Sequence, residues 1–248
     1  MKIVDGVAAL ELTREFMGQK GTIYPTLIWD KDSVVLVDTG FPGQLQSIRE
    51  AMEKEAIPLE RLEKIIITHQ DIDHIGSLPD LVQELGGTVK VLAHQEEKPY
   101  IQGEKPLVKM KQFGKFAESL PEEQRRRITA LFANPPKANV DTTVSDGEIL
   151  PYVGGITVVF TPGHSPGHIC LYLNQSKTLV TGDALTVSEG LLYGPNPQAT
   201  ANLETALESL KKLTKYDIQT VISYHGGVFQ DNPNQRIFEI ANGELAFK

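Results

Sequence analysis

Histidine and aspartate residues gather where an apolar, β-branched run of the sequence ends. His69 and His74 follow the run Lys64–Thr68, and Asp71 and Asp73 lie between them. Because His69 and Asp71 are two positions apart, their side chains point to the same side of an extended chain. Neutral imidazole and carboxylate groups together are ligands of zinc, iron and manganese. We therefore expect this one segment to face two metal ions.

The other ligand candidates come from distant parts of the chain. His164, Asp183 and His225 each follow another apolar run within a few residues. Loops at one end of a sheet are where a rigid scaffold presents chemical groups, so these side chains are available to complete a metal site. Asp38 and His168 lie in similar positions, and we expect them to orient a ligand or a loop.

The elements that must position these residues are predicted from hydrophobic periodicity. Apolar β-branched runs alternate with helical patterns, which is typical of α/β architecture. The runs predict strands at Val34–Val37, Lys64–Thr68, Thr88–Leu92, Ile156–Phe160, Leu179–Thr181 and Thr220–Ser223. Apolar stripes predict helices over Leu45–Met52, from near Asp73 to Leu85, and over Leu203–Leu213 behind a candidate N-cap at Asn202.

Two stretches of the chain have the same pattern. Residues 26–40 and 169–183 each contain an apolar strand, a polar turn, a second apolar strand and then an aspartate. Each is a β-hairpin signal. The recurrence predicts two similar halves packed together, with a two-layer sheet sandwich inside and helices outside.

Residues 98–137 differ from the rest of the chain. They contain nine lysine and arginine residues but only four glutamates. Met110, Phe113, Phe116 and Leu120 would share one helix face, and Ser119 with Glu122 fits a capping box. We interpret this segment as a helical, lid-like insertion. Its charges either attract an anionic substrate or simply form a solvated face.

Composition excludes several classes of protein. The 248 residues carry a formal net charge of −8, which disfavours nucleic acid as a partner. No apolar run approaches the roughly 18 residues that span a bilayer, and Asp5 and Glu11 interrupt the first residues where a signal peptide is apolar. A single cysteine, Cys170, fits a reducing compartment. We expect a cytoplasmic protein that binds a small molecule and neither nucleic acid nor membrane.

The ordered motifs resemble the metallo-β-lactamase superfamily of metallohydrolases over nearly the whole chain. They are Val-Asp38-Thr-Gly, His69-Gln-Asp71-Ile-Asp73-His74, Thr-Pro-Gly-His164, Thr-Gly-Asp183 and His225-Gly. The resemblance implies one domain over residues 1–248 with a four-layer αβ/βα sandwich and a dinuclear metal site at one sheet edge. It also implies that His69, the residue at 71 and His164 hold a first divalent ion, that Asp73, His74 and His225 hold a second, and that Asp183 bridges the two.

Asp71 departs from the family motif, which is H-x-H-x-D-H. With two divalent ions and a bridging hydroxide, the carboxylates of Asp71, Asp73 and Asp183 give a site of zero net charge, where a second histidine would leave a positive one. A more neutral site favours a harder metal, so iron or manganese becomes an alternative to zinc at the first position. Asp71 can also stay outside the metal shell, in which case only the second position fills.

The resemblance implies a metal-dependent hydrolase in which a metal-bridging hydroxide attacks an ester, lactone or thioester carbonyl. Asp73 is the expected proton carrier to the leaving group, and Tyr224, next to His225, is a candidate donor to the developing oxyanion. Phosphodiester hydrolysis is an alternative within the same chemistry. Asp71 also motivates a non-haem iron oxidoreductase or oxygenase, and a weakened first position motivates a non-catalytic metal-binding protein.

Overall fold

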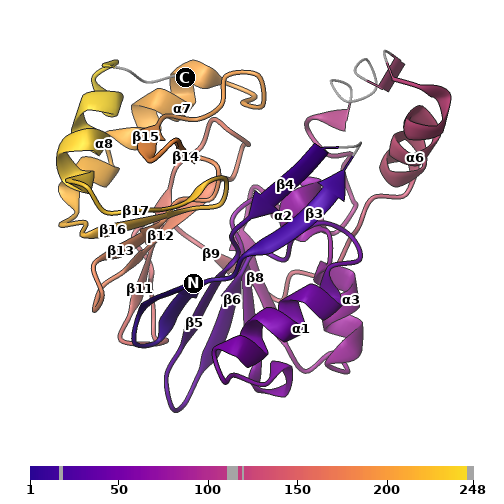
Figure 1. The fold of residues 1–248 in the computed structure, drawn as a ribbon, viewed down its shortest axis with the longest axis horizontal. Helices are drawn as coiled ribbons and strands as arrows, with labels where there is room; N and C mark the ends of the chain where they lie inside the picture. The colour runs from indigo at the N-terminus through magenta and orange to yellow at the C-terminus, as the bar shows by residue number, and fades with distance from the viewer. Residues whose placement is uncertain (17–18, 111–116, 119, 245–248) are drawn as a thin grey trace.

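Two β-sheets packed face to face form the centre of the computed structural model, which describes residues 1–16, 19–110, 117–118 and 120–244 (Figure 1). The first sheet has the strand order β1 (Lys2–Val4), β2 (Val7–Ala9), β5 (Thr26–Trp29), β6 (Val34–Val37), β7 (Lys64–Ile67), β8 (Lys90–His94) and β9 (Thr142–Val144). The second has the order β10 (Ile149–Leu150), β11 (Ile156–Phe160), β12 (Ile169–Leu173), β13 (Thr178–Val180), β16 (Thr220–Ser223) and β17 (Gly227–Phe229). Two separate hairpins are formed by β3 (Leu12–Phe16) with β4 (Gln19–Ile23) and by β14 (Thr186–Ser188) with β15 (Leu191–Tyr193).

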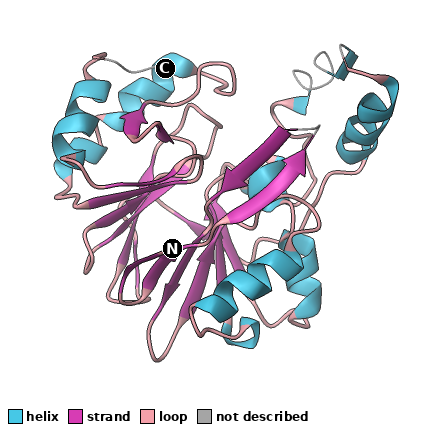
Figure 2. Ribbon diagram, in the orientation of Figure 1, coloured by secondary structure: helices cyan, strands magenta, loops and turns pink. Residues whose placement is uncertain are grey.

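Helices cover the outer face of each sheet (Figure 2). The first sheet is flanked by α1 (Leu45–Lys54) and α3 (Leu78–Glu84), and the second by α7 (Leu203–Leu210) and α8 (Pro233–Ala241). The remaining helical segments are α2 (Ile72–Ile75), α4 (Lys98–Ile101), α6 (Glu122–Ala133) and the short 3-10 turns η1 (Leu59–Arg61) and η2 (Leu213–Lys215). Across the described residues, none of these helices has the length and hydropathy needed to cross a membrane.

Strand alternation divides the apolar side chains into three packed layers. In β6, Leu36 belongs to the outer layer with Ile48 of α1, while Val35 and Val37 belong to the inner layer with Ile222 of the second sheet. Successive side chains of a strand point to opposite faces, so a strand buried on both faces must be apolar throughout. The third layer lies between the second sheet and helices α7 and α8. The predicted four-layer αβ/βα sandwich is confirmed.

The two halves share a topology, as the repeated pattern predicted. The first repeat forms the antiparallel pair β5–β6 and the second forms the pair β12–β13. Each pair then continues with a parallel neighbour, β7 beside β6 and β16 beside β13. Asp38 and Asp183 follow the corresponding strands of the two halves. Both aspartates therefore emerge at the same end of their sheets.

Local turns explain where the observed elements differ from the predicted ones. Strand β8 begins at Lys90 because the amide of Thr88 donates to the carbonyl of Leu85 and closes a turn there. The predicted helix from Asp73 to Leu85 is divided into α2 and α3. Helix α7 ends at Leu210, although its predicted N-cap is confirmed by the Asn202 side chain, which accepts from the Thr205 amide.

The basic segment 98–137 contains α4 and α6, and α6 lies to one side of the molecule, away from both sheets (Figure 1). Its described side chains are exposed or half-buried, Leu131 and Phe132 being among the half-buried ones. The expectations for Phe113, Phe116 and Ser119 lie outside the described residues. Helix α6 of the insertion therefore does not pack on either sheet. The role of the insertion as a lid remains a prediction.

Gly76 separates α2 from α3 because the loop after β6 passes directly against it. The Gly76 amide donates to the Gly40 carbonyl at 2.8 Å, and a Cβ at position 76 would lie 2.3 Å from backbone atoms of Phe41 and Pro42. A real side chain cannot approach a neighbouring backbone this closely. Gly76 thus permits the contact that holds the Asp38 loop against the ligand-bearing α2.

We expect Gly76→Ala to lower the free energy of unfolding by about 1–3 kcal/mol, because the added methyl group overpacks this contact. Gly21→Ala is a matched control, since a Cβ there meets nothing within 4 Å. Urea denaturation of both variants measures the difference. A Gly76→Ala variant as stable as Gly21→Ala would contradict the packing argument.

Candidate metal centre

All seven predicted ligands meet at one edge of the sandwich. His69 follows β7, His164 follows β11, Asp183 follows β13 and His225 follows β16. Asp71 is the N-cap of α2, and Asp73 and His74 lie within that helix. The side chains fall into a first ligand group of His69, Asp71, His164 and Asp183 and a second ligand group of Asp73, His74 and His225. Strands from both halves therefore contribute to one site.

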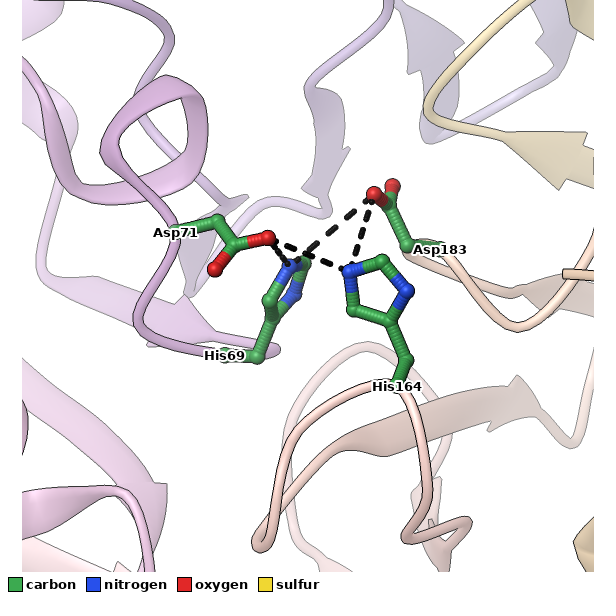
Figure 3. Close-up of side chains that lie close together, drawn as sticks. All are labelled: His69, Asp71, His164 and Asp183. Atoms are coloured by element: carbon green, nitrogen blue, oxygen red, sulfur yellow. Dashed lines mark hydrogen bonds and ion pairs between the residues drawn. The ribbon is translucent and has the colours of Figure 1, made fainter. Parts of the chain in front are cut away.

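The first ligand group is shown in Figure 3, where carboxylates from two separate loops face the rings of two histidines. Asp71 Oδ2 lies 3.3 Å from His69 Nε2 and 3.2 Å from His164 Nε2. Asp183 Oδ2 lies 3.3 Å from His164 Nε2 and 4.0 Å from His69 Nε2. Two nitrogens and two oxygens thus converge on a common point, as ligands of a single ion do.

Asp183 also faces the second ligand group. Its Oδ1 atom lies 3.3 Å from His74 Nε2 and 3.4 Å from His225 Nε2. Asp73 Oδ2 lies 3.2 Å from His225 Nε2 and 3.8 Å from His74 Nε2. The two oxygens of Asp183 therefore point to different groups, which is the arrangement expected of a bridging carboxylate.

Hydroxyl groups set the ring protons of two first-group histidines. Thr68 Oγ1 donates to Asp38 Oδ2 at 2.7 Å, so it accepts from His69 Nδ1 at 3.0 Å. In the same way, Thr200 Oγ1 donates to the Asn196 carbonyl and accepts from His164 Nδ1 at 3.3 Å. A hydroxyl has one proton to give, so each ring carries its own proton on Nδ1. Nε2 of both histidines is left with a lone pair directed into the site.

Asp38 orients His74 from behind. Its Oδ2 accepts from His74 Nδ1 at 2.8 Å, and its Oδ1 accepts from the Thr68 amide at 2.8 Å. Asp38 has φ 61, a left-handed backbone conformation that is costly for a non-glycine residue. The role expected for Asp38, holding a ligand ring, agrees with these bonds.

Tyr224 and His168 support the ligands without joining them. The Tyr224 ring stacks on His74 with centroids 3.8 Å apart, and its hydroxyl donates to the Asp73 carbonyl and accepts from the Gly40 amide. This hydroxyl therefore does not present a proton to the ligand cluster, where we had expected a donor to an oxyanion. His168 Nε2 accepts from the Asp183 amide at 3.1 Å and so fixes the backbone of that residue.

Burial and neighbouring charge give the ligand histidines opposite pKa shifts. Burial, aided by the neighbouring His74, lowers the pKa of His69 to about 4. Burial would also lower the pKa of His225, but the Asp183 and Asp73 carboxylates outweigh it and raise that pKa to about 10. The pKa of His74 is likewise raised well above its ordinary value by Asp38, Asp183 and Asp73, against the effect of burial.

Three buried ligand atoms have no hydrogen-bond partner among the described residues: His69 Nε2, His74 Nε2 and Asp183 Oδ1. A buried polar atom without a partner is costly and calls for an explanation. All three atoms are candidate metal ligands on the inner side of the cluster. The donor set and its unpartnered atoms fit divalent metal ions, which these residues would hold.

Two buried residues at the site were missed by the sequence analysis. The Lys109 ammonium, 5% exposed, bonds Asp71 Oδ2 and lies 2.6 Å from His164 Nε2. Glu97 is fully buried and accepts from Gln70 and from the loop after His164. Lys109 lies in a segment rich in basic residues, and Glu97 follows a predicted strand without a motif of its own. Neither has a spacing signal that links it to the ligands.

Comparison with known proteins identifies the class of the protein. The chain belongs to the metallo-β-lactamase superfamily, whose family model matches residues 19–225. It is 29% identical over 211 residues to the probable metallo-hydrolase YflN of Bacillus subtilis, covering 78% of this chain and 75% of that protein. It is 28% identical over 211 residues to the hydroxyacylglutathione hydrolase GloC of Haemophilus influenzae, covering 81% and 84%.

The fold of the chain is also found in solved structures. A metallo-beta-lactamase family protein from Thermus thermophilus, TTHA1429, superposes with a TM-score of 0.70 at 23% identity, covering 96% of this chain and 79% of that one. Family membership together with the ligand cluster makes this protein a metal-dependent hydrolase. The predicted superfamily and enzyme class are confirmed.

We expect Asp38→Asn to weaken metal binding by the second ligand group about 10–100-fold, because His74 loses the charged acceptor that fixes its ring. Asparagine tolerates the left-handed backbone, so the fold should persist. Competition with a chromophoric chelator measures the affinity. The exposed Asp80→Asn makes the same charge change away from the site and should leave the affinity unaltered. An unchanged affinity in Asp38→Asn would show that His74 needs no such support.

We expect metal binding by the second ligand group to release at least one proton at pH 7. With a pKa of about 10, the metal-free His225 is protonated, and a divalent ion binds only the neutral ring. The affinity should therefore rise about tenfold per pH unit for each proton displaced, until the pH passes the pKa of the ring. Calorimetry in buffers of different ionisation enthalpy counts the protons. The His225→Ala variant should release about one proton fewer than wild type on binding the metal. Equal proton release by the variant and wild type would exclude His225 as the source.

Proposed function

We propose that this metal-dependent hydrolase cleaves the thioester or ester bond of a small acyl compound. The observation that carries the proposal is the ligand cluster. Hydroxyl groups hold the Nδ1 protons of His69 and His164, so that Nε2 of each ring keeps a lone pair, and Asp183 faces both ligand groups. One relative, GloC, carries the name of a thioester hydrolase. Esters, lactones and thioesters share an acyl carbon open to attack by water, so the same centre suits all three.

A divalent ion held by the second ligand group with Asp183 would lower the pKa of a water molecule and polarise the substrate carbonyl, and zinc suits a donor set of histidine nitrogens and carboxylate oxygens. The protein's own side chains supply orientation and proton transfer. Asp73 keeps 20% of its side chain exposed beside the more open His225, at 39%. We assign to the Asp73 carboxylate the transfer of the proton to the leaving group. Tyr224 holds Asp73 and His74 in place through its hydroxyl and its ring.

The insertion contains a pocket of its own, lined by residues of the segment 98–137. A pocket of about 370 Å³ is lined by residues that include Met110, which follows Lys109, and Arg125, Phe132 and Ala133 of α6. Its size matches sites for small organic molecules, which are mostly apolar with a few polar groups. Its charged lining residues are Arg125 and Glu118. We propose that this pocket receives part of a small anionic substrate whose negative group pairs with Arg125.

The iron-dependent alternative rested on Asp71. In the structure Asp71 bonds the Lys109 ammonium, so its carboxylate has a partner that does not require a harder metal. This observation favours hydrolysis over an iron-dependent oxygenase reaction. An assay without oxygen distinguishes the two reactions, because hydrolysis needs no oxygen.

The purified, zinc-loaded chain should hydrolyse a hydroxyacylglutathione thioester faster than free zinc does, under strict exclusion of oxygen. Thiol release measures the rate, and a matched oxygen ester, a lactone and a phosphodiester define the preference. A chelator should abolish turnover and added zinc restore it. His225→Ala, which removes a ligand at the open rim, should reduce the rate at least about tenfold.

The other functions would give different results in the same assay. Turnover of the phosphodiester alone would show that the substrate is a phosphate ester and not an acyl compound. Turnover only in the presence of oxygen and iron would support an oxygenase. A rate equal to that of free zinc on every substrate would support a metal-binding protein without catalysis.

A further inference from the structure

The Lys109 side chain ends among the atoms of the first ligand group. Its ammonium bonds Asp71 Oδ2 and lies 2.6 Å from His164 Nε2, and the side chain is 5% exposed. These are the same oxygen and nitrogen that converge with His69 and Asp183 in the first group. Because the Nε2 atom of His164 carries a lone pair, it can accept from an ammonium as readily as it can bind a metal. The ammonium therefore bonds two of the atoms, Asp71 Oδ2 and His164 Nε2, that a metal ion in the first ligand group would need.

A buried polar network holds this part of the chain in place. The Val108 amide donates to Gln70 Oε1 at 2.7 Å, and Gln70 lies between the ligands His69 and Asp71. The Gln70 amide and side chain donate to Glu97 Oε2 at 2.9 and 3.0 Å. On its other oxygen, Glu97 accepts from Ser165 Oγ and the Gly167 amide, both at 2.6 Å.

This network joins the insertion to both ligand loops of the first group. One end of Glu97 holds the loop of His69 and Asp71, and its other end holds the loop that follows His164. Leu107 packs in the apolar core two residues before Lys109. The backbone before Lys109 is thus fixed on both sides by buried contacts, so the position of its ammonium is part of the fold.

Charge explains why an ammonium belongs beside Asp71. A neutral histidine at position 71 would offer no charge to a lysine, whereas the Asp71 carboxylate forms an ion pair with Lys109. A buried charge needs such a partner. The three carboxylates Asp71, Asp73 and Asp183 are balanced by one divalent ion together with one ammonium, without a second ion.

We propose that the Lys109 ammonium occupies the first metal position, so that this protein holds one divalent ion, in the second ligand group with Asp183. The inference rests on the proposed metal-dependent function but concerns the number of ions. An ion at the first position would need Asp71 Oδ2 and His164 Nε2, so it must displace the ammonium. His69 Nε2, which has no hydrogen-bond partner among the described residues, stays available to an ion that enters once the ammonium is gone.

The test counts zinc ions bound to the folded protein by native mass spectrometry after titration with zinc. Wild type should bind one ion per chain tightly, whereas Lys109→Met, an unbranched side chain that ends one atom short of the ammonium position and carries no charge, should bind two. Lys105→Met is the matched control, because Lys105 is exposed in the same segment and should leave the count at one.

Asp71→His provides a second route if Lys109→Met fails to fold. A neutral imidazole removes the ion pair with Lys109 and restores the family motif, so this variant should also bind two ions. Wild type that binds two ions with similar affinity would overturn the proposal. A single ion in every folded variant would overturn it as well, since emptying the position would then admit no metal.

These outcomes are independent of the substrate. A protein that turns over no thioester but gains an ion in Lys109→Met would contradict the proposed reaction and support the role of Lys109. Thioester hydrolysis by a wild-type protein that binds two ions tightly would support the proposed reaction and contradict the role of Lys109.

Discussion

The site depends on one electrostatic constraint, which is that several buried or half-buried carboxylates lie close together and must be neutralised. Asp183 is 7% exposed, and its two oxygens face the first and the second ligand groups. Isolated charges are too costly to bury, so a protein places cations or proton donors around them. The raised pKa of His225, the Lys109 ion pair and the fit to divalent ions are all responses to this constraint.

The sandwich meets the constraint by bringing two similar halves together at their strand ends. Parallel pairing of β7 with β6 and of β16 with β13 sends His69 and His225 to the same edge as Asp38 and Asp183. Behind the ligands, hydroxyl and carboxylate groups set the ring protons, and they come from several segments: Asp38 after β6, Thr68 after β7 and Thr200 before α7. The apolar layers therefore position the ligands, and the polar groups behind them determine which nitrogen is free for a metal.

Much of this was predictable because strands and metal motifs have local signatures. Strands β6, β11 and β16 begin and end at the predicted residues, since continuous β-branched runs can only be buried on both faces. The predicted ligands converge because each one follows such a strand. The divided helix at Gly76 was not predictable, because the obstacle is the backbone of a loop more than thirty residues away in sequence.

The sequence by itself determined the superfamily, the sandwich and the set of candidate metal ligands, because residue type, order and spacing can be read along the chain. Only the tertiary structure decided how Asp71 is neutralised and what Tyr224 does. Lys109 reaches Asp71 through an ion pair 38 residues apart in sequence, and the Tyr224 hydroxyl bonds the Asp73 carbonyl 151 residues away. No local pattern encodes such contacts, since they arise only when the packed layers bring distant loops to one edge.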